Sequence, residues 1–362
     1  MGIATVFNLW RLRSLLDYNA MPREESMGVR DQYQRPAKDL RISVTDRCNF
    51  RCLYCMPLPE YAWVERKELL TFEEIVRLTR LFVRLGVEKI KLTGGEPLLR
   101  RNLEELIAHL VAIPGVRDLC LTTNGALLAE KAGRLRAAGL RRVNVSLDTL
   151  DAEKFRRITQ RGELGRVLEG LFEAKRVGLH PVKINAVIER GVNEDDIIPL
   201  ARFALEHGFA LRFIEYMDVG TANAWRWEKV VPKAEIVRIL AREFPLREIG
   251  REQESDTAVR YQVAEGRGDI GIIASVTEPF CAGCTRVRVT SDGKLVTCLF
   301  SPDGYDLKAL LRGNASDEEI LAAIARVWSA RRDRYSEERL EALRAGRPLL
   351  PQPRWEMIRL GG

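Results

Sequence analysis

Short segments in which apolar and polar residues alternate recur between residues 40 and 215. Each is followed by a longer segment with the apolar spacing of an amphipathic helix. Strands that alternate with helices in this way are typical of a parallel sheet covered by helices. We therefore predict six strands, at residues 41–45, 89–93, 119–123, 142–146, 182–187 and 211–215.

The helices between these strands have recognisable ends. Thr71 is followed by acidic residues in the first turn, which is the pattern of a helix N-cap. Glycines follow four helical segments, where a left-handed residue can end a helix: Gly86, Gly139, Gly178 and Gly208. The predicted helices cover residues 71–85, 103–112, 127–138, 165–177 and 195–207.

The two faces of the predicted strands differ in character. Side chains alternate across a strand, and one face is apolar, with Ile42, Val44, Ile90, Leu92, Val143, Val145, Val182, Ile184, Leu211 and Phe213. The other face is polar and cationic. A closed eight-stranded barrel fills its interior with branched apolar side chains. A six-stranded sheet with a polar inner face therefore predicts an open, partial barrel around a hydrophilic ligand.

Several polar or small residues come just after predicted strands, namely Cys48, Gly94, Asn124 and Asp148. The active sites of parallel sheets covered by helices lie at the carboxyl ends of the strands. We therefore expect these residues at the active site.

The alternation of strands and helices stops after residue 216. We predict a helix at 232–243, antiparallel strands at 260–264 and 270–275, a hairpin of strands 285–290 and 295–299, and helices at 317–329 and 336–345. Residues 1–36 carry no strand pattern. The expected organisation is a flexible extension at 1–36, a partial barrel at 37–231 and a C-terminal domain at 232–362.

The chain of 362 residues is long enough to bury a large core, so it does not need disulfides for stability. Grouped cysteines, no secretory signal and no apolar run that could span a membrane indicate a reducing cytoplasm. The formal charge is +7, but aromatic residues are only 7% of the chain and no nucleic-acid-binding motif is present. The charge therefore indicates a solvated surface and an anionic small substrate.

Six of the seven cysteines form two sets of three. The first set is Cys48, Cys52 and Cys55, and the second is Cys281, Cys284 and Cys298. Four thiolates normally hold an iron–sulfur cluster or a structural zinc. A set of three therefore predicts a metal centre with one coordination position open to an exchangeable ligand.

A structural zinc site is the alternative interpretation. The histidines, His109, His180 and His207, are far in sequence from both sets, so neither set gains a neighbouring imidazole. Zinc stays open for the second set, because a cysteine pair followed by a later cysteine is common in zinc ribbons. Cys120 lies outside both sets and is expected to be a small buried core residue.

The spacing of the first set, with Thr93-Gly94-Gly95-Glu96-Pro97 about 40 residues later, resembles the signature of radical S-adenosylmethionine (SAM) enzymes. The resemblance extends through residues 46–57, 93–100, 122–125, 145–148 and 280–298. Within that superfamily, the chain resembles the GTP 3′,8-cyclase family of molybdenum cofactor biosynthesis. The features that carry this resemblance are the second cysteine set, the segment 285–288 that follows Cys284, and the terminal Gly-Gly. That resemblance covers the chain from about residue 38 to its end.

The resemblance implies an α/β fold, a partial (βα)6 radical SAM barrel with a C-terminal α+β extension carrying a second iron–sulfur cluster. It implies two [4Fe-4S] clusters. Cys48, Cys52 and Cys55 would hold the cluster whose fourth iron binds SAM, and Cys281, Cys284 and Cys298 would hold the cluster that binds guanine. The SAM contacts implied by the family are Tyr54, Gly94, Gly95, Glu96, Thr122, Ser146 and Met217.

Cations on the predicted inner face match the family's substrate-binding positions. Arg286 and Arg288 share parity with Cys284, so in an extended segment both would project on the side of a cluster ligand. Guanidinium groups suit phosphate oxygens, although a surface ion pair is the alternative for any one of these residues. The expected triphosphate-binding residues are Arg41, Lys89, Lys91, Lys183, Arg212, Arg286 and Arg288.

The implied activity is that of a lyase. Hydrogen abstraction from ribose C3′ of GTP, attack on guanine C8 and reduction would give 3′,8-cyclo-7,8-dihydro-GTP. Catalytic roles are expected for Arg286, Arg288, Gly361 and Gly362. The expected partners are GTP, a one-electron donor and a downstream cyclic pyranopterin monophosphate synthase, with no nucleic acid and no membrane. The sequence does not decide the oligomeric state, and a homodimer is one option.

Two other functions are consistent with parts of the sequence. A radical SAM enzyme that modifies a peptide would also use additional clusters, but such enzymes generally carry more C-terminal cysteines than these three. A cluster-bearing nucleic-acid sensor would account for the basic charge and the cysteines. It would leave the Gly-Gly-Glu motif and the polar inner face unexplained.

Overall fold

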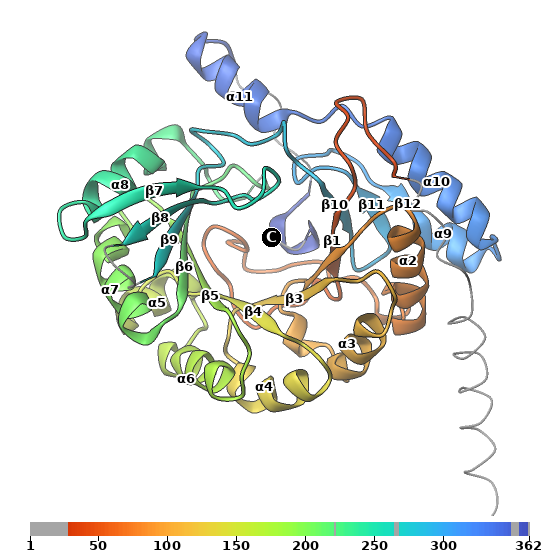
Figure 1. Cartoon of the computed structure of the whole chain (residues 1–362), viewed down its shortest axis with the longest axis horizontal. Coiled ribbons are helices and arrows are strands. Elements are labelled where there is room, and N and C mark those ends of the chain that lie inside the picture. The colour runs from red at the N-terminus through yellow and green to blue at the C-terminus, as the bar shows by residue number, and fades with distance from the viewer. Residues whose placement is uncertain (1–27, 221, 264–267, 349–354, 361–362) are drawn as a thin grey trace, which may run out of the picture.

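The computed structural model describes residues 28–220, 222–263, 268–348 and 355–360. Within these residues a 12-stranded sheet curves around a central space, and helices cover its outer side (Figure 1). The central part of the sheet is a run of parallel strands that neighbour one another in sequence order. These are β1 (Asp39–Ser43), β2 (Lys89–Thr93), β3 (Asp118–Thr123), β4 (Arg142–Ser146), β5 (Val182–Ile188) and β6 (Ala210–Glu215).

All six predicted barrel strands are present. The strands predicted at 89–93 and 142–146 have the observed bounds, whereas β1 begins and ends two residues earlier than predicted. The apolar face that was predicted from the alternation packs against the helices, and Ile42, Leu92, Val145 and Ile184 are among its buried residues. The alternation therefore identified which face of the sheet meets the helices.

The helices also begin and end close to the predicted residues. Thr71 caps α2 and shares a capping box with Glu74, and the four predicted glycines have positive φ angles. The helices are α2 (Phe72–Arg84), α3 (Leu103–Val111), α4 (Leu128–Ala137), α5 (Ala152–Thr159), α6 (Leu164–Arg176), α7 (Ile197–His207), α8 (Lys233–Leu240), α9 (Leu307–Arg312), α10 (Asp317–Ser329), α11 (Tyr335–Arg344) and α12 (Met357–Leu360). Short 3-10 helices are η1 (Arg66–Glu68), η2 (Pro97–Leu99), η3 (Glu194–Asp196) and η4 (Trp227–Lys229).

The C-terminal strands continue the barrel sheet at both of its edges. The predicted antiparallel pair and the predicted hairpin are confirmed, but β9 also pairs in parallel with β6, and β10 pairs in parallel with β1. A six-stranded partial barrel would leave the backbone groups of β1 and β6 unpaired at its edges. The added strands are β7 (Leu246–Gly250), β8 (Val259–Val263), β9 (Asp269–Ile273), β10 (Arg286–Val289), β11 (Lys294–Val296) and β12 (Tyr305–Asp306).

The described part of the predicted N-terminal extension packs against the C-terminal helices. Gln32 N–H donates to the Arg331 carbonyl at 3.3 Å, just after α10 ends. Asp31 and Arg35 are both buried. Residues 1–27 of the predicted flexible extension lie outside the described residues.

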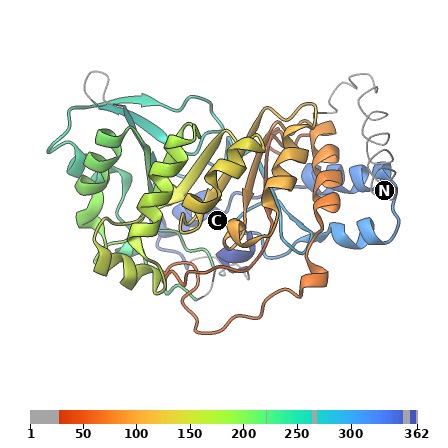
Figure 2. The same ribbon diagram turned by 90° about the horizontal axis from the view of Figure 1, so that it is seen from below.

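A loop of the N-terminal half extends beyond one end of the barrel. This loop follows β1, carries the first cysteine set and is drawn in orange at the lower edge of Figure 2. The last described helix, α12, lies near the same end, and Glu356, Ile358 and Arg359 line a small cavity together with Asp46 and Tyr61. The C-terminal segment is therefore placed beside the first cysteine loop.

Within the described part of the chain, no helix combines the length and the apolar content needed to cross a membrane.

Candidate active site

The first cysteine loop rests on the Gly-Gly-Glu segment that follows β2. Gly95 N–H donates to the Thr45 carbonyl and Glu96 N–H donates to the Arg47 carbonyl, each at 2.7 Å. A Cβ atom on Gly95 would lie 2.3 Å from the Arg47 carbonyl oxygen, and one on Gly94 would lie 2.5 Å from the Thr45 oxygen. Only glycine therefore allows the backbone of the cysteine loop to approach this closely.

Glu96 joins the loops that follow β2 and β3. Its buried carboxylate accepts hydrogen bonds from Leu98 N–H at 2.9 Å, from the Thr123 hydroxyl at 2.7 Å and from Asn124 N–H at 2.7 Å. Burial raises the pKa of Glu96 to about 7 in spite of these hydrogen bonds. The carboxylate retains acceptor capacity, because two oxygens offer about four lone-pair sites.

The three cysteines of the first set are half-buried, and their thiols lie in a desolvated environment. Desolvation raises the pKa of Cys48 to about 11 and also raises the pKa values of Cys52 and Cys55. Backbone N–H of Phe50 and the side-chain amide of Asn124 donate to the Cys48 sulfur at 3.4 and 3.8 Å. Iron ligation requires thiolates, so positive charge from bound iron would replace these protons.

Tyr54, in the same loop, is hydrogen-bonded to Asp148, which lies just after β4. Its hydroxyl donates to Asp148 Oδ2 at 2.8 Å, and Val187 N–H donates to Asp148 Oδ1 at 2.8 Å. Burial raises the pKa of Asp148 to about 6. The sequence predicts Asp148 at the active site without a specific contact, and in the structure its carboxylate accepts the hydrogen bond that fixes Tyr54.

The second cysteine set surrounds a small cavity of about 60 Å³, which Arg286, Arg288, Met217 and Phe300 also line. Arg286 donates to the Cys284 sulfur through Nε at 3.2 Å and through a terminal nitrogen at 3.1 Å. Burial disfavours the Cys284 thiolate, but the Arg286 and Arg331 guanidinium groups outweigh it and lower its pKa to about 6. A thiolate at neutral pH with neighbouring thiols fits a metal or cluster ligand set.

The thiols of the second set are not equivalent. Burial raises the pKa of Cys298 to about 11, and it also raises the pKa of Cys281. Cys284 is therefore the anionic member of the set before any metal binds.

A row of inner-face residues crosses the sheet beside this cavity. Strand register aligns Arg288 with Arg41, Arg41 with Lys91, Lys91 with Cys120 and Cys120 with Arg142. Cys120 is buried as expected, but it belongs to this polar face and not to the apolar core. Its position follows from the parity it shares with Thr122, because alternate residues of a strand point to one face.

The cations of this face outnumber the carboxylates beside them, which include Asp39 and the Asp118 that pairs with Arg142. Burial and the nearby Arg41 lower the pKa of Lys91 to about 8, and burial and Arg212 lower the pKa of Lys183 to about 8. Nε of Arg41 and Nε of Arg288 are buried and have no hydrogen-bond partner among the described residues. Buried donors without partners are costly, so these groups are suited to a polar, anionic ligand.

Five of the seven predicted substrate cations line one cavity of about 590 Å³ at the amino ends of the barrel strands. They are Arg41, Lys89, Lys91, Lys183 and Arg212. The β7–β8 connection also lines this cavity, and Gln253 in it accepts a hydrogen bond from Lys89 Nζ at 2.7 Å. Arg286 and Arg288 line the cavity of the second cysteine set and continue the row of cations.

The two cysteine sets lie near opposite ends of β1. Cys48 follows the carboxyl end of the strand, whereas Arg286, two residues after Cys284, is aligned with Asp39 at its amino end. The 5 residues of β1 span roughly 17 Å at about 3.3 Å per residue. The cationic face lies along the interval between the two sets.

The other predicted contact residues fall at several places. Thr122 and Ser146 lie on the inner face, with Thr122 accepting a hydrogen bond from the Asn144 amide at 3.3 Å. Met217, expected at SAM, lines the cavity of the second set. Gly361 and Gly362 lie outside the described residues. Among the described side chains, no three of His, Cys, Asp and Glu are arranged to hold a single metal ion.

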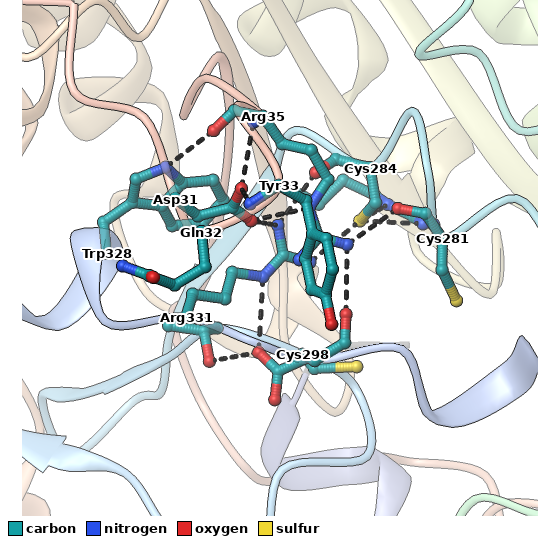
Figure 3. A network of polar contacts seen from close by, with 12 residues as sticks. Asp31, Gln32, Tyr33, Arg35, Cys281, Cys284, Cys298, Trp328 and Arg331 are labelled. Carbon is teal, nitrogen blue, oxygen red and sulfur yellow. Dashed lines mark hydrogen bonds and ion pairs between the residues drawn. The ribbon is translucent and has the colours of Figure 1, made fainter. Parts of the chain in front are cut away.

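Three buried residues beside the second set were not predicted as site residues. Asp31 pairs with Arg35 and with Arg331, and the two arginines donate to the carbonyls of Cys281 and Cys284 (Figure 3). Close to 300 residues separate Asp31 from Arg331 in sequence. No local pattern could have indicated the contact.

Both halves of the chain match known family models. Residues 42–204 match the radical SAM superfamily, and residues 209–337 match Molybdenum Cofactor Synthesis C. A solved structure of SuiB from Streptococcus suis bound to S-adenosylmethionine has a TM-score of 0.55 and 16% identity, covering 82% of this chain and 67% of that one. At that identity the likeness shows the fold alone.

Curated relatives match nearly the whole chain. A GTP 3′,8-cyclase of Acidothermus cellulolyticus is 51% identical over 320 residues, which are 86% of this chain and 88% of that protein. GTP 3′,8-cyclases of Xanthomonas axonopodis pv. citri and Aquifex aeolicus are each 46% identical, covering 92% of this chain and 99% of the relative. On these matches, the chain belongs to the GTP 3′,8-cyclase family of the radical SAM superfamily.

Proposed function

We propose that this protein converts GTP to 3′,8-cyclo-7,8-dihydro-GTP, the first step of molybdenum cofactor biosynthesis. Family membership supports the reaction. The observation that carries the assignment to this chain is the row of aligned cations along β1, Arg288, Arg41 and Lys91, with a cysteine set near each end of that strand. In this row Nε of Arg41 and Nε of Arg288 are buried without a partner among the described residues. A nucleoside triphosphate supplies anionic oxygens for such a row, and its purine can reach toward one end.

At the first site, Cys48, Cys52 and Cys55 would hold a [4Fe-4S] cluster. When bound, this cluster supplies the electron that cleaves SAM to a 5′-deoxyadenosyl radical. The chain's contribution is to hold the loop rigidly, through the contacts of Gly95 and Glu96 with its backbone. Thr122 and Ser146 on the inner face, and Tyr54 in the loop, are proposed SAM contacts.

At the second site, Cys281, Cys284 and Cys298 would hold another cluster, with guanine at its open position. Arg41, Lys89, Lys91, Lys183 and Arg212 would bind the triphosphate from the cavity that they share. Arg286 and Arg288 lie between this cavity and the cysteines, so they are proposed to meet both the nucleotide and the cluster ligands. Gly361 and Gly362 are proposed to complete the catalytic residues.

The substrate would then be fixed in one orientation, with its sugar toward the radical source. The hydrogen on C3′ would leave for the radical that bound SAM supplies, and the substrate's C3′ carbon would then bond to C8. One electron, from the one-electron donor, and one proton would complete the dihydro product. The chain's role in these steps is positioning and exclusion of water, because a held substrate replaces a bimolecular encounter.

The partners beyond GTP follow from the reaction. A one-electron donor must reduce the first site, and we propose that the product passes to a cyclic pyranopterin monophosphate synthase. A homodimer is also proposed.

Anaerobic reconstitution tests the function. We expect about eight irons per chain, because each [4Fe-4S] site binds four, and a change in the second cluster's spectrum on adding GTP. A peptide or an oligonucleotide should leave that spectrum unchanged. With SAM and a reductant, GTP should yield the 3′,8-cyclised nucleotide and 5′-deoxyadenosine.

Cys284→Ser is the matched variant for this experiment. It should retain about four irons and cleave SAM, but it should give no cyclised nucleotide. Wild-type protein that holds both clusters but responds to a peptide in place of GTP would refute the proposal.

A further inference from the structure

Residues 31–35 and the segment just after α10 form a buried ionic network beside the second cysteine set (Figure 3). The Asp31 side chain is 0% exposed and forms ion pairs with Arg35 at 2.6 Å and with Arg331 at 3.3 Å. Asp31 Oδ1 also accepts from Tyr33 N–H and Arg35 N–H, each at 2.9 Å. Asp31 is therefore the anion that holds two guanidinium groups in place.

Both guanidinium groups bind the cysteine pair. Arg35 donates to the Cys281 carbonyl at 2.8 Å. Arg331 donates to the Cys284 carbonyl at 2.8 Å and to the Cys284 sulfur at 3.3 Å. The Trp328 indole N–H donates to the Arg35 carbonyl at 3.0 Å, and the Arg331 guanidinium lies 4.6 Å from the Trp328 ring centroid.

Arg331 differs from Arg286, which also contacts the Cys284 sulfur. Arg331 follows α10 and is not part of a barrel strand. Its Nε and both terminal nitrogens are occupied by Asp333, Asp31 and the two Cys284 atoms, and its side chain is 1% exposed. An arginine with these protein partners and this burial is suited to holding a cysteine ligand, not to binding substrate.

We propose that Arg331, held by Asp31 and Arg35, is a positioning residue that sets the reduction potential of the cluster on Cys281, Cys284 and Cys298. The inference rests on the proposed second cluster. Hydrogen bonds to ligand sulfurs and nearby charge are the main protein controls on cluster potential. Reduction adds negative charge to the cluster. The positive charge of Arg331 at the Cys284 sulfur therefore favours the reduced cluster, and the negative charge of Asp31 disfavours it.

Two substitutions in the network should therefore act in opposite directions. Arg331→Gln removes the positive charge and should lower the ratio of reduced to oxidised second cluster about tenfold at a fixed potential, which is 59 mV for one electron. Asp31→Asn removes the negative charge and should raise that ratio. Arg331→Lys keeps the charge but loses the fork geometry, so it should lie between wild type and Arg331→Gln.

The measurement is an anaerobic redox titration of the reconstituted full chain, followed by electron paramagnetic resonance. The first cluster, on Cys48, Cys52 and Cys55, serves as the internal standard and should titrate as in wild type. Arg332→Gln changes an exposed neighbouring cation and should shift neither cluster.

The outcomes separate the inference from the proposed function. About four irons in wild-type protein, all on the first set, would mean that the second cluster does not exist, so the proposed function fails. If every variant held two clusters and its second cluster had the same reduction potential as in wild type, the inference would be overturned and the proposed function would stand. Loss of the second cluster from all three network variants, or shifts of one sign for Arg331→Gln and Asp31→Asn, would assign a structural role and also overturn it.

Discussion

The protonation of the inner-face lysines, Lys91 and Lys183, depends on what is bound in the cavity that they line. Lys91 and Lys183 are desolvated, and each has an arginine as the nearest cation. Such crowding opposes the charged form of both side chains, and no described carboxylate compensates it fully. The folded chain therefore holds two lysine amines that are protonated more readily when an anion binds beside them.

We expect GTP to bind more weakly as the pH rises through about 8. The pKa values of Lys91 and Lys183 are lowered to about 8, so both lysines are largely charged below this pH and largely neutral above it. A bound triphosphate raises both values, so affinity should fall by up to about tenfold per lysine between pH 7 and 9. Isothermal titration of GTP into SAM-free protein measures the effect.

The control is the Lys91→Arg, Lys183→Arg double variant, whose guanidinium groups stay charged over this range. Its affinity should change much less between pH 7 and 9. Equal pH dependence in wild type and the double variant would place the titrating groups elsewhere.

The residue-level predictions from sequence succeeded where strand periodicity applied. Arg41, Lys91 and Arg288 were expected on one face, and the register aligns them. Cys120 was assigned to the core because of its apolar character, although its parity with Thr122 indicates the inner face. Arg331 could not be found, since its contact with Asp31 depends on tertiary packing between distant segments.

At the level of elements, the site depends on two loops that share backbone hydrogen bonds. The cysteine loop after β1 and the Gly-Gly-Glu loop after β2 are joined at Thr45 and Arg47, before the first thiol. Parallel neighbours end at the same edge of a sheet, so their loops meet there. The position of the first cysteine set therefore depends on glycines about 40 residues later in the chain.

Gly95→Ala should displace the cysteine loop. The added Cβ atom would stand 2.3 Å from the Arg47 carbonyl oxygen, and backbone must shift to relieve this contact. We expect a destabilisation of about 1–3 kcal/mol and loss of iron from the first set only. Iron analysis and chemical denaturation of the reconstituted protein measure the two effects.

Gly165→Ala is the matched control, because this glycine lies in α6 and an added Cβ atom would meet nothing within 4 Å. It should raise stability by about 0.5–1 kcal/mol and leave the iron content unchanged. If Gly95→Ala retained all of its iron, the loop contact would not be what positions the thiols.

Element prediction was accurate for segments with a clear period and failed for short or uniformly exposed ones. The barrel strands have one buried face, whereas β7 has only exposed and half-buried residues and gives no alternation. The helices α5 and α9 have 8 and 6 residues, too few to establish an amphipathic pattern. Edge pairing of β9 and β10 with the barrel is set by tertiary structure.

At the level of the whole molecule, the sheet crosses the boundary between the two halves of the chain. β10 and β9 close the two edges of the barrel, at β1 and β6, so the segments that match the two family models share one hydrogen-bonded sheet. The described N-terminal residues add a third link through Arg331. The two halves should therefore behave as one cooperative unit.

We expect the full chain to unfold in a single transition. Val287→Ala in β10, where Val287 is 1% exposed, removes two methyl groups and should lower stability by about 2 kcal/mol. The same loss should be reported by probes in the barrel and in the C-terminal helices. Scanning calorimetry and site-specific fluorescence check this, and two separate transitions, with the barrel unaffected by Val287→Ala, would contradict it.

The pairing of β1 with β10 also has a consequence for substrate selection. The first cysteine set follows β1, whereas Cys281 and Cys284 of the second set precede β10, which pairs with β1. The interval between the two loops is therefore maintained by a backbone ladder. Side-chain rearrangement cannot lengthen or shorten a ladder of this kind. A nucleotide that reaches both sites must therefore fit a fixed distance between them. We expect the enzyme to accept nucleotides with a different number of phosphates, but not nucleotides in which the distance between base and sugar is changed.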